Sequence, residues 1–174
     1  DTSFRSSSLG GSCNTITCKT CNSSIVGGFK SVIDLESCNS SIIGGYCNQI
    51  CGSTAGGGYG PGGCGSCNSS IIGGCCNQIL FDSCNSSIIG GCCNKVVGCG
   101  GSGRNSIIGG AYGIISYSDH SAIIGGECNT ICGESDYSVI IGGCCGVIYE
   151  TQYSAIIGGC CNTICIGGGN DHGY

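Results

Sequence analysis

Cysteine is the residue type through which this chain could do the most chemistry. The sequence contains 21 cysteines among 174 residues, a content typical of disulfide scaffolds or of metal sites. Two Cys-x-x-Cys pairs, Cys18 with Cys21 and Cys64 with Cys67, have the spacing of half a zinc site. Each pair would need a matching second half, and the chain has only 2 histidines, which lie in separate segments. We therefore expect no metal ion and no cofactor.

The other reactive side chains form no catalytic pattern. Serine is plentiful, but it recurs at regular intervals instead of standing once beside a base. The sequence identifies no carboxylate that converges on His120 or His172. An enzyme built on a β-helix would need carboxylates clustered on one face, whereas the 10 acidic residues here are scattered. We expect that the chain is not an enzyme.

One motif, Ser-x-Ile-Ile-Gly-Gly, recurs along nearly the whole chain. The fold of this repeat therefore decides where the cysteines, serines and other reactive side chains lie. At its first apolar position the successive steps are 17, 29, 17, 19, 16, 17 and 16 residues. Residues 53–58 could be a degenerate copy that splits the long step, and residues 7–11 a copy before the first. A short fixed period is the signature of a solenoid, so we expect about ten coils of roughly 16–17 residues. These coils cover about 7–166, with a glycine-rich tail at 167–174, in a single domain 1–174.

The fold class predicted by this repeat is all-β, a parallel β-solenoid or β-roll. Each unit offers one β-segment at Ser-x-Ile-Ile and a second at Asn-x-Ile, with Gly-Gly as the bend between them because glycine accepts positive φ. The differences in repeat length fall in the variable segment, which forms the other corner. Identical residues then stack in ladders, with coils about 4.8 Å apart.

Two isoleucine ladders follow from this stacking. Adjacent residues of an extended segment point to opposite faces, so only one of the two can enter the core of a thin solenoid. The other ladder, at positions 26, 43, 72, 89, 108, 124, 141 and 157, would face outward as an apolar stripe and form an oligomer interface. A local bend that turns both positions inward is the alternative. The first positions, which form the core or interface ladder, are Ile25, Ile42, Ile71, Ile88, Ile107, Ile123, Ile140 and Ile156.

Many of the cysteines fall into columns of this repeat, two of which are filled in adjacent coils. Stacked residues have Cα atoms about 4.8 Å apart, inside the range of about 4.4–6.8 Å that a disulfide needs. This pattern predicts disulfides between coils, joining Cys21 to Cys38, Cys67 to Cys84, Cys75 to Cys92 and Cys144 to Cys160. A third column precedes the repeated Asn and is expected to be a buried ladder of thiols, at Cys13, Cys47, Cys76, Cys93, Cys128, Cys145 and Cys161.

Composition excludes several classes of partner. Charged residues make up 9 % of the chain and the net charge is −5, so no basic patch exists to bind nucleic acid or an anionic membrane. The apolar runs are only a few residues long, too short for membrane insertion. Disulfides, where they persist, place a protein in an oxidising or extracellular setting.

The repeat resembles a known family. Units such as 41–50 (SIIGGYCNQI) and 155–164 (AIIGGCCNTI) are similar to the head repeats of trimeric autotransporter adhesins, the YadA-like heads, and to the Gly-Gly-Asn repeats of phage and large-virus fibre proteins. The resemblance covers about 7–166 and implies a left-handed parallel β-roll, a trimer around one axis, and adhesion to a surface or receptor. The family period is somewhat shorter, and the cysteine content departs from bacterial heads and suits a viral or unusual extracellular fibre better.

Together these observations predict a structural and adhesive fibre component, located outside the cell or on the cell or virion surface. Its first partner is itself, as a homotrimer or filament, and a cell-surface receptor or glycan is a candidate second partner. The alternative is an ice-binding, antifreeze-type solenoid monomer, although the sequence lacks the flat array of threonines expected for that function. Exposed contact groups are expected in the variable corners, at Tyr112, Tyr117, Tyr137, Tyr149 and Tyr153.

Overall fold

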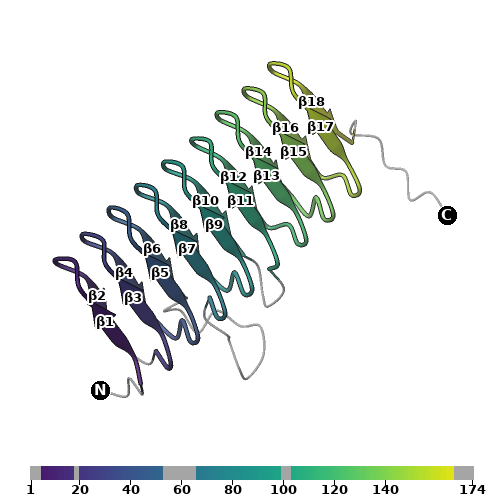
Figure 1. Ribbon diagram of the computed structural model, residues 1–174. Coiled ribbons are helices and arrows are strands. Elements are labelled where there is room, and N and C mark those ends of the chain that lie inside the picture. Colours follow the sequence, from purple (N-terminus) through teal and green to yellow (C-terminus); the bar gives the residue numbers. More distant parts are fainter. Residues whose placement is uncertain (1–4, 18–19, 53–65, 99–102, 167–174) are drawn as a thin grey trace, which may run out of the picture.

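The computed structural model describes residues 5–17, 20–52, 66–98 and 103–166 of the chain. The chain winds as a parallel β-solenoid of about eight turns of about 17 residues, and the coils stack along one axis from the purple first coil to the yellow last coil (Figure 1). The described ranges contain no helix, and therefore none that could span a bilayer. The predicted fold class is confirmed.

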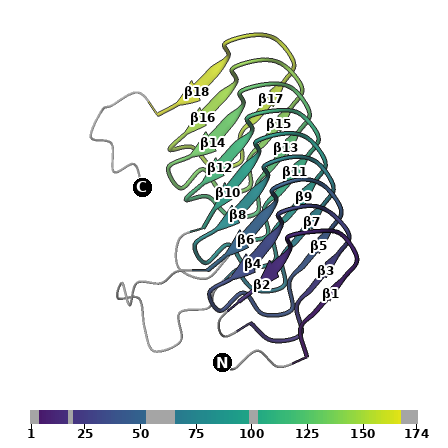
Figure 2. The ribbon, with the colours of Figure 1, turned by 90° about the vertical axis from the view of Figure 1, so that its left-hand side faces the viewer.

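Each coil contributes one strand to each of two 9-stranded parallel sheets, which face each other across the solenoid (Figure 2). The strands of the first sheet come from the Ser-x-Ile-Ile phrase: β1 (Ser7–Leu9), β3 (Ser24–Val26), β5 (Ser41–Ile43), β7 (Ser70–Ile72), β9 (Ser87–Ile89), β11 (Ser106–Ile108), β13 (Ala122–Ile124), β15 (Val139–Ile141) and β17 (Ala155–Ile157).

The second sheet is formed by the segments that follow the Gly-Gly bends. Its strands are β2 (Thr15–Ile16), β4 (Val32–Asp34), β6 (Gln49–Cys51), β8 (Gln78–Leu80), β10 (Lys95–Val97), β12 (Ile114–Ser116), β14 (Thr130–Cys132), β16 (Val147–Tyr149) and β18 (Thr163–Cys165).

Nine strands per sheet correct the expected ten coils. The copy at 7–11 exists as β1, which pairs with β3. Among the described residues no coil lies between β5 and β7, because β5 pairs directly with β7 and β6 directly with β8. The degenerate copy predicted at 53–58 lies outside the described residues.

The core is a double ladder of β-branched side chains. The middle residue of every strand from β3 to β17 in the first sheet points inward, and Ile25, Ile42, Ile71, Ile88, Ile107 and Ile140 have no exposed surface. Ile123 and Ile156 of the same ladder are 1 % and 6 % exposed. The facing ladder of the second sheet holds Ile33, Ile50, Ile79, Val96, Ile115, Ile131 and Ile148, all fully buried. Burial of these side chains is the main favourable term that holds the coils together.

The corner after the first sheet is bound by an asparagine ladder inside the coils. The Asn77 side-chain amide donates to the carbonyl of Gly90 in the next coil, at 3.1 Å. Its Oδ1 accepts the backbone N–H of Asn94, at 3.0 Å. Because Asn94 repeats the arrangement with Gly109 and Gly113, each asparagine fixes the bend of the coil above it.

The opposite corner is bound by a serine ladder. The Ser69 hydroxyl donates to the carbonyl of Ser83 in the next coil, at 2.7 Å, and accepts the backbone N–H of Ser86, at 3.3 Å. Ser23, Ser40, Ser121 and Ser138 do the same in their coils. These bonds satisfy buried backbone groups that a coil of this width could not otherwise pair.

Candidate functional site

The outward ladder of the first sheet is a continuous apolar row on the surface of the described residues. We call it the isoleucine face, and it consists of Val26, Ile43, Ile72, Ile89, Ile108, Ile124, Ile141 and Ile157. The first seven are 40–47 % exposed, and Ile157 in the last coil is 79 % exposed. They stand in register because the strands pair residue for residue, for example Ile72 with Ile89 and Ile89 with Ile108. The two isoleucines therefore point to opposite faces, and no local bend turns both inward.

No charge interrupts this face. None of the nine strands of the first sheet contains a charged residue, and the second outward column, beside the isoleucine face, holds only Ser, Ala or Val. The outward side of the second sheet is different, because Asp34, Gln49, Gln78, Lys95 and Thr130 are scattered along it. The solenoid thus has one apolar face and one mixed face.

The two residues after each Gly-Gly bend form what we call the thiol corner. Its first column is joined from coil to coil by single backbone bridges, such as Cys75 with Cys92 and Cys144 with Cys160. Its second column has φ near +55° throughout, for example +56° at Cys76 and +57° at Cys93. That left-handed conformation turns the side chain outward at the bend.

Ten cysteines of the thiol corner form two clusters with the same arrangement. Each cluster has a column of three and a column of two, over three successive coils. The N-terminal cluster is half-buried and the C-terminal cluster is mostly exposed. The N-terminal cluster consists of Cys47, Cys75, Cys76, Cys92 and Cys93. The C-terminal cluster consists of Cys128, Cys144, Cys145, Cys160 and Cys161.

The predicted buried ladder of seven thiols is therefore wrong. Cys13, Cys128, Cys145 and Cys161 are exposed, and the remaining three are half-buried. The left-handed backbone at this position explains the error, because the alternation of an extended strand does not continue through the bend.

The predicted disulfides between coils are not formed either. No disulfide joins Cys75 to Cys92 or Cys144 to Cys160, and none joins any other two described cysteines. The Cα spacing of stacked residues suits a disulfide, but their Cβ atoms lie about as far apart as the strands, about 4.8 Å. A disulfide requires Cβ atoms about 3.5–4.5 Å apart. An in-register ladder holds its side chains too far apart for this bond.

At the opposite corner, Cys21, Cys38, Cys67 and Cys84 form one column over four successive coils. The backbone N–H of Asn39 binds the Cys21 carbonyl, that of Asn68 binds Cys38, and that of Asn85 binds Cys67. The sequence suggested two separate pairs, because the 29-residue step was expected to contain another coil. Cys38 instead neighbours Cys67, so the pairwise filling that favoured disulfides here does not exist.

The thiols of this corner column are engaged in hydrogen bonds. The backbone N–H of Cys21 donates to Cys38 Sγ at 3.3 Å, and Cys67 Sγ donates to the Glu36 carbonyl at 3.4 Å. A thiol–thiol hydrogen bond with Cys84 and burial both raise the pKa of Cys67. Cys18 and Cys64, the partners in the two Cys-x-x-Cys pairs, lie outside the described residues.

In the C-terminal coils, the column next to these cysteines carries stacked rings at the position that asparagines hold in the N-terminal coils. His120 stacks on Tyr137 with ring centroids 4.7 Å apart, and Tyr137 stacks on Tyr153 at 5.1 Å. Arg104 Nη1 lies 3.1 Å from His120 Nε2 and extends the stack by one coil. The five tyrosines expected to present contact groups are 44–76 % exposed, but only Tyr137 and Tyr153 stack on each other.

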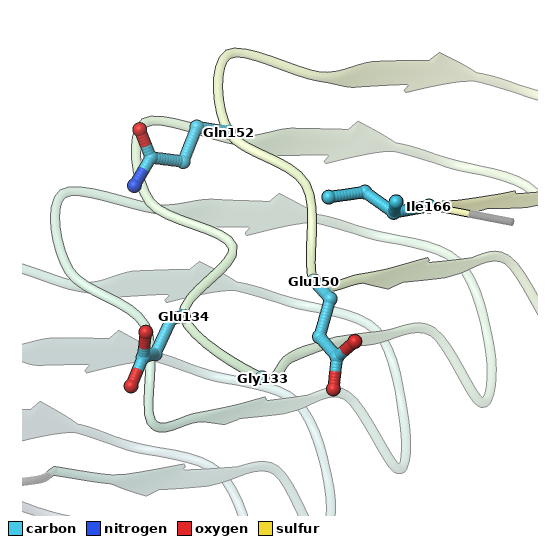
Figure 3. Close-up of a pocket in the computed structure, with 5 residues that line it drawn as sticks. All are labelled: Gly133, Glu134, Glu150, Gln152 and Ile166. Atoms are coloured by element: carbon cyan, nitrogen blue, oxygen red, sulfur yellow. The ribbon is translucent and has the colours of Figure 1, made fainter. Parts of the chain in front are cut away.

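A small surface depression lies near the C-terminal end, lined by Gly133, Glu134, Glu150, Gln152 and Ile166 (Figure 3). Its two carboxylates come from successive coils, and its lining includes neither a histidine nor a cysteine. Within the described ranges, no group of three or more His, Cys, Asp or Glu side chains converges as a metal site.

Comparison with other proteins adds no family. No protein-family model matches this chain, and no curated protein matches it either. By its fold and composition, the chain is a cysteine-rich β-solenoid repeat protein.

Proposed function

We propose that this protein is a structural and adhesive component of a fibre, in which copies of the chain pack together through the isoleucine face. The observation that carries the proposal is the exposure of eight β-branched side chains in one uninterrupted row. At about 4.8 Å per strand, a row over eight strands is about 34 Å long. Monomeric proteins rarely leave so long an apolar stripe in water.

A second copy of this chain is the occupant that fits the face best. Two in-register ladders have the same spacing of about 4.8 Å, so side chains from one copy can fill the spaces of another along the whole row. The absence of charge from the first sheet removes the desolvation cost that would oppose such packing. A mixed face such as that of the second sheet suits contact with water.

Three chains around one axis is the assembly proposed, with the isoleucine faces turned towards the axis. This number comes from the resemblance to trimeric adhesin heads and virus fibres. The location, outside the cell or on the cell or virion surface, rests on the same resemblance, because no described cysteine forms the disulfide that would have supported it. A receptor or glycan would contact the exposed variable corners.

We do not propose the alternative function of ice binding. Thr15, Thr130 and Thr163 occupy the same outward column of the second sheet, but in coils one, seven and nine. They therefore form no array. Thr54 lies outside the described residues.

Light scattering coupled to size-exclusion chromatography tests the proposal. We expect the natural chain to elute with three times the mass of the chain, and the double variant Ile89→Lys/Ile108→Lys to elute as a monomer that keeps its β-sheet circular dichroism. The matched control is Gln78→Lys/Thr130→Lys on the second sheet, which should remain trimeric.

Electron microscopy of the natural material should then show rods with threefold symmetry. A natural chain that stays monomeric at every concentration would overturn the proposal. A control variant that dissociates as readily as the face variant would also overturn it, since added charge alone would then explain the effect.

A further inference from the structure

The two thiol clusters have a feature that the proposed function does not use. In each pair of adjacent cysteines the two sulfurs lie side by side. The Sγ–Sγ distance is 3.3 Å for Cys75 with Cys76 and for Cys92 with Cys93. It is 3.4 Å for Cys144 with Cys145 and 3.3 Å for Cys160 with Cys161. All four pairs therefore adopt nearly the same side-chain arrangement.

The distance between sulfurs of neighbouring coils follows from this repetition. Because the arrangement repeats and the backbones are bridged in register, each sulfur of a column lies about one strand spacing, about 4.8 Å, from the next. The thiols of Cys76 and Cys93 also interact from coil to coil, as do those of Cys145 and Cys161.

A disulfide is unfavourable both between cysteines of neighbouring coils and between the two cysteines of one coil. Along a column the Cβ atoms are too far apart, as described above. Within a coil the two residues are consecutive, with Cα atoms about 3.8 Å apart, whereas a disulfide needs about 4.4 Å or more. The backbone therefore holds ten outward-facing sulfurs close together without a route to an unstrained covalent bond.

The column spacing does suit a metal ion with two ligands. A zinc–thiolate bond is about 2.3 Å long. A two-coordinate Cu(I)–thiolate bond is slightly shorter, so two such bonds in line span a little less than the column spacing. Soft thiolate ligands select soft ions such as Cu(I), which accepts a linear pair of sulfurs. A linear site needs no third ligand, so the lack of a converging group of three in the described residues does not oppose it.

We propose that the thiol corner binds Cu(I) ions between successive coils, each held by two cysteine sulfurs of one column. Cys75 with Cys92 and Cys76 with Cys93 hold two ions in the N-terminal cluster. Cys144 with Cys160 and Cys145 with Cys161 hold two in the C-terminal cluster. The proposal is independent of the fibre function and would stand if the isoleucine face bound nothing.

Binding must displace protons. Each Cu(I) replaces two thiol protons and forms two copper–sulfur bonds, so the pair of thiols becomes a complex with one negative charge and two protons leave to water. Affinity should therefore rise with pH, since fewer protons have to be displaced.

The experiment is an anaerobic titration of the reduced full chain with Cu(I), in competition with a chromogenic Cu(I) chelator. We expect about four ions per chain to be retained, and X-ray absorption to show two sulfur neighbours per ion, at a distance slightly shorter than the about 2.3 Å of a zinc–thiolate bond. A native-state thiol count comes first. If disulfide bonds occupy the thiol corner, the proposal fails.

Paired variants decide where the ions lie. Cys75→Ser/Cys76→Ser removes the middle coil of the N-terminal cluster and should lower the capacity from about four ions to about two, because Cys47 and Cys93 are then two coils apart. Loss of only one ion would show binding within a coil and would overturn the proposed geometry. Cys51→Ser/Cys132→Ser is the control, since each of these cysteines is paired with non-cysteine residues in both neighbouring strands.

A gain of binding gives the complementary test. Tyr112 stands in the second column between Cys93 and Cys128, with the same left-handed backbone, φ +54°. Tyr112→Cys would join the two columns of three thiols into a column of seven and should add one ion. Equal capacity in this variant, together with an equal loss in the control, would indicate that Cu(I) binds thiols without regard to coil spacing and would overturn the proposal.

Discussion

The segment 69–74 (SSIIGG) consists of three doublets of identical residues, and the members of each doublet have opposite environments. Ser69 is buried and Ser70 is half-exposed; Ile71 is fully buried and Ile72 is 44 % exposed. A Cβ atom at Gly73 would meet nothing within 4 Å, whereas one at Gly74 would lie 2.9 Å from the Gly90 carbonyl carbon.

The difference shows that residue type alone does not decide the role of a position in this fold. Inner members pack against the coil above and hold the solenoid together. Outer members are available for contact with other molecules. Substituting the two members of one doublet in parallel therefore separates folding from association.

The isoleucine doublet should give the largest contrast. Ile71→Ala leaves a cavity in the closed core and should lower the free energy of unfolding by about 2–5 kcal/mol. Ile72→Ala should leave the urea midpoint of the monomer nearly unchanged and should weaken self-association instead. Urea unfolding and light scattering on both variants measure the two effects. Equal loss of stability in both would contradict the assignment of Ile72 to an interface.

The glycine doublet should rank second. Both residues have positive φ, +68° at Gly73 and +77° at Gly74, so alanine at either costs about 1–2 kcal/mol in backbone conformation. Gly74→Ala should cost more, because its methyl group also overlaps the Gly90 bend of the next coil. Thermal unfolding of the two variants should give a clearly lower midpoint for Gly74→Ala. If the midpoint of Gly73→Ala were lower than that of Gly74→Ala, the close contact with the next coil would be at Gly73, which would contradict the structure.

The serine doublet should give a smaller effect. Ser69→Ala leaves the Ser83 carbonyl and the Ser86 N–H without their partner, at a cost of about 1–3 kcal/mol. Ser70→Ala, on the outward column, should change stability by no more than about 0.5 kcal/mol. Hydrogen exchange at the Ser86 amide provides a local readout, and it should be faster in Ser69→Ala alone.

The smallest expected effect is a pH dependence from the half-buried Asp82. Burial, with a contribution from Glu36, raises the pKa of Asp82 above its ordinary value of 3.8. The folded chain then binds more protons than the unfolded chain between these two values, so the free energy of unfolding falls as pH rises through that interval. Asp82→Asn should abolish this fall, as measured by urea midpoints across the acidic range. A stability that rises over the same interval in the natural chain alone would reverse the sign and refute the shift.

Much of this architecture could be predicted from the repeat. The period indicated a parallel β-solenoid, and the adjacent isoleucines indicated one inward and one outward ladder, because an extended strand alternates its faces. The asparagine ladder was visible as a repeated Asn, but its bonds to the next Gly-Gly bend were not. They depend on how far one coil is displaced from the next.

The cysteine predictions failed where local conformation and stacking mattered most. Cys76 and Cys93 were expected inside, but a left-handed backbone turns that position outward. The disulfide between Cys75 and Cys92 was predicted from the general spacing of stacked Cα atoms, and the structure contains no such bond. Side-chain separation across coils is a property of the assembled stack, so the order of residues could not supply it.

The amino-acid sequence by itself determined the inside and outside of each coil, because Ser-Ser-Ile-Ile-Gly-Gly is a local pattern and alternation along a strand is a local property. Only the tertiary structure decided which coils are neighbours. It placed β5 against β7 across a 29-residue separation of pairing partners, such as Ile43 with Ile72, and so brought Cys38 beside Cys67. That choice depends on long-range pairing, in which burial of a shared core outweighs the entropy of closing the longer loop.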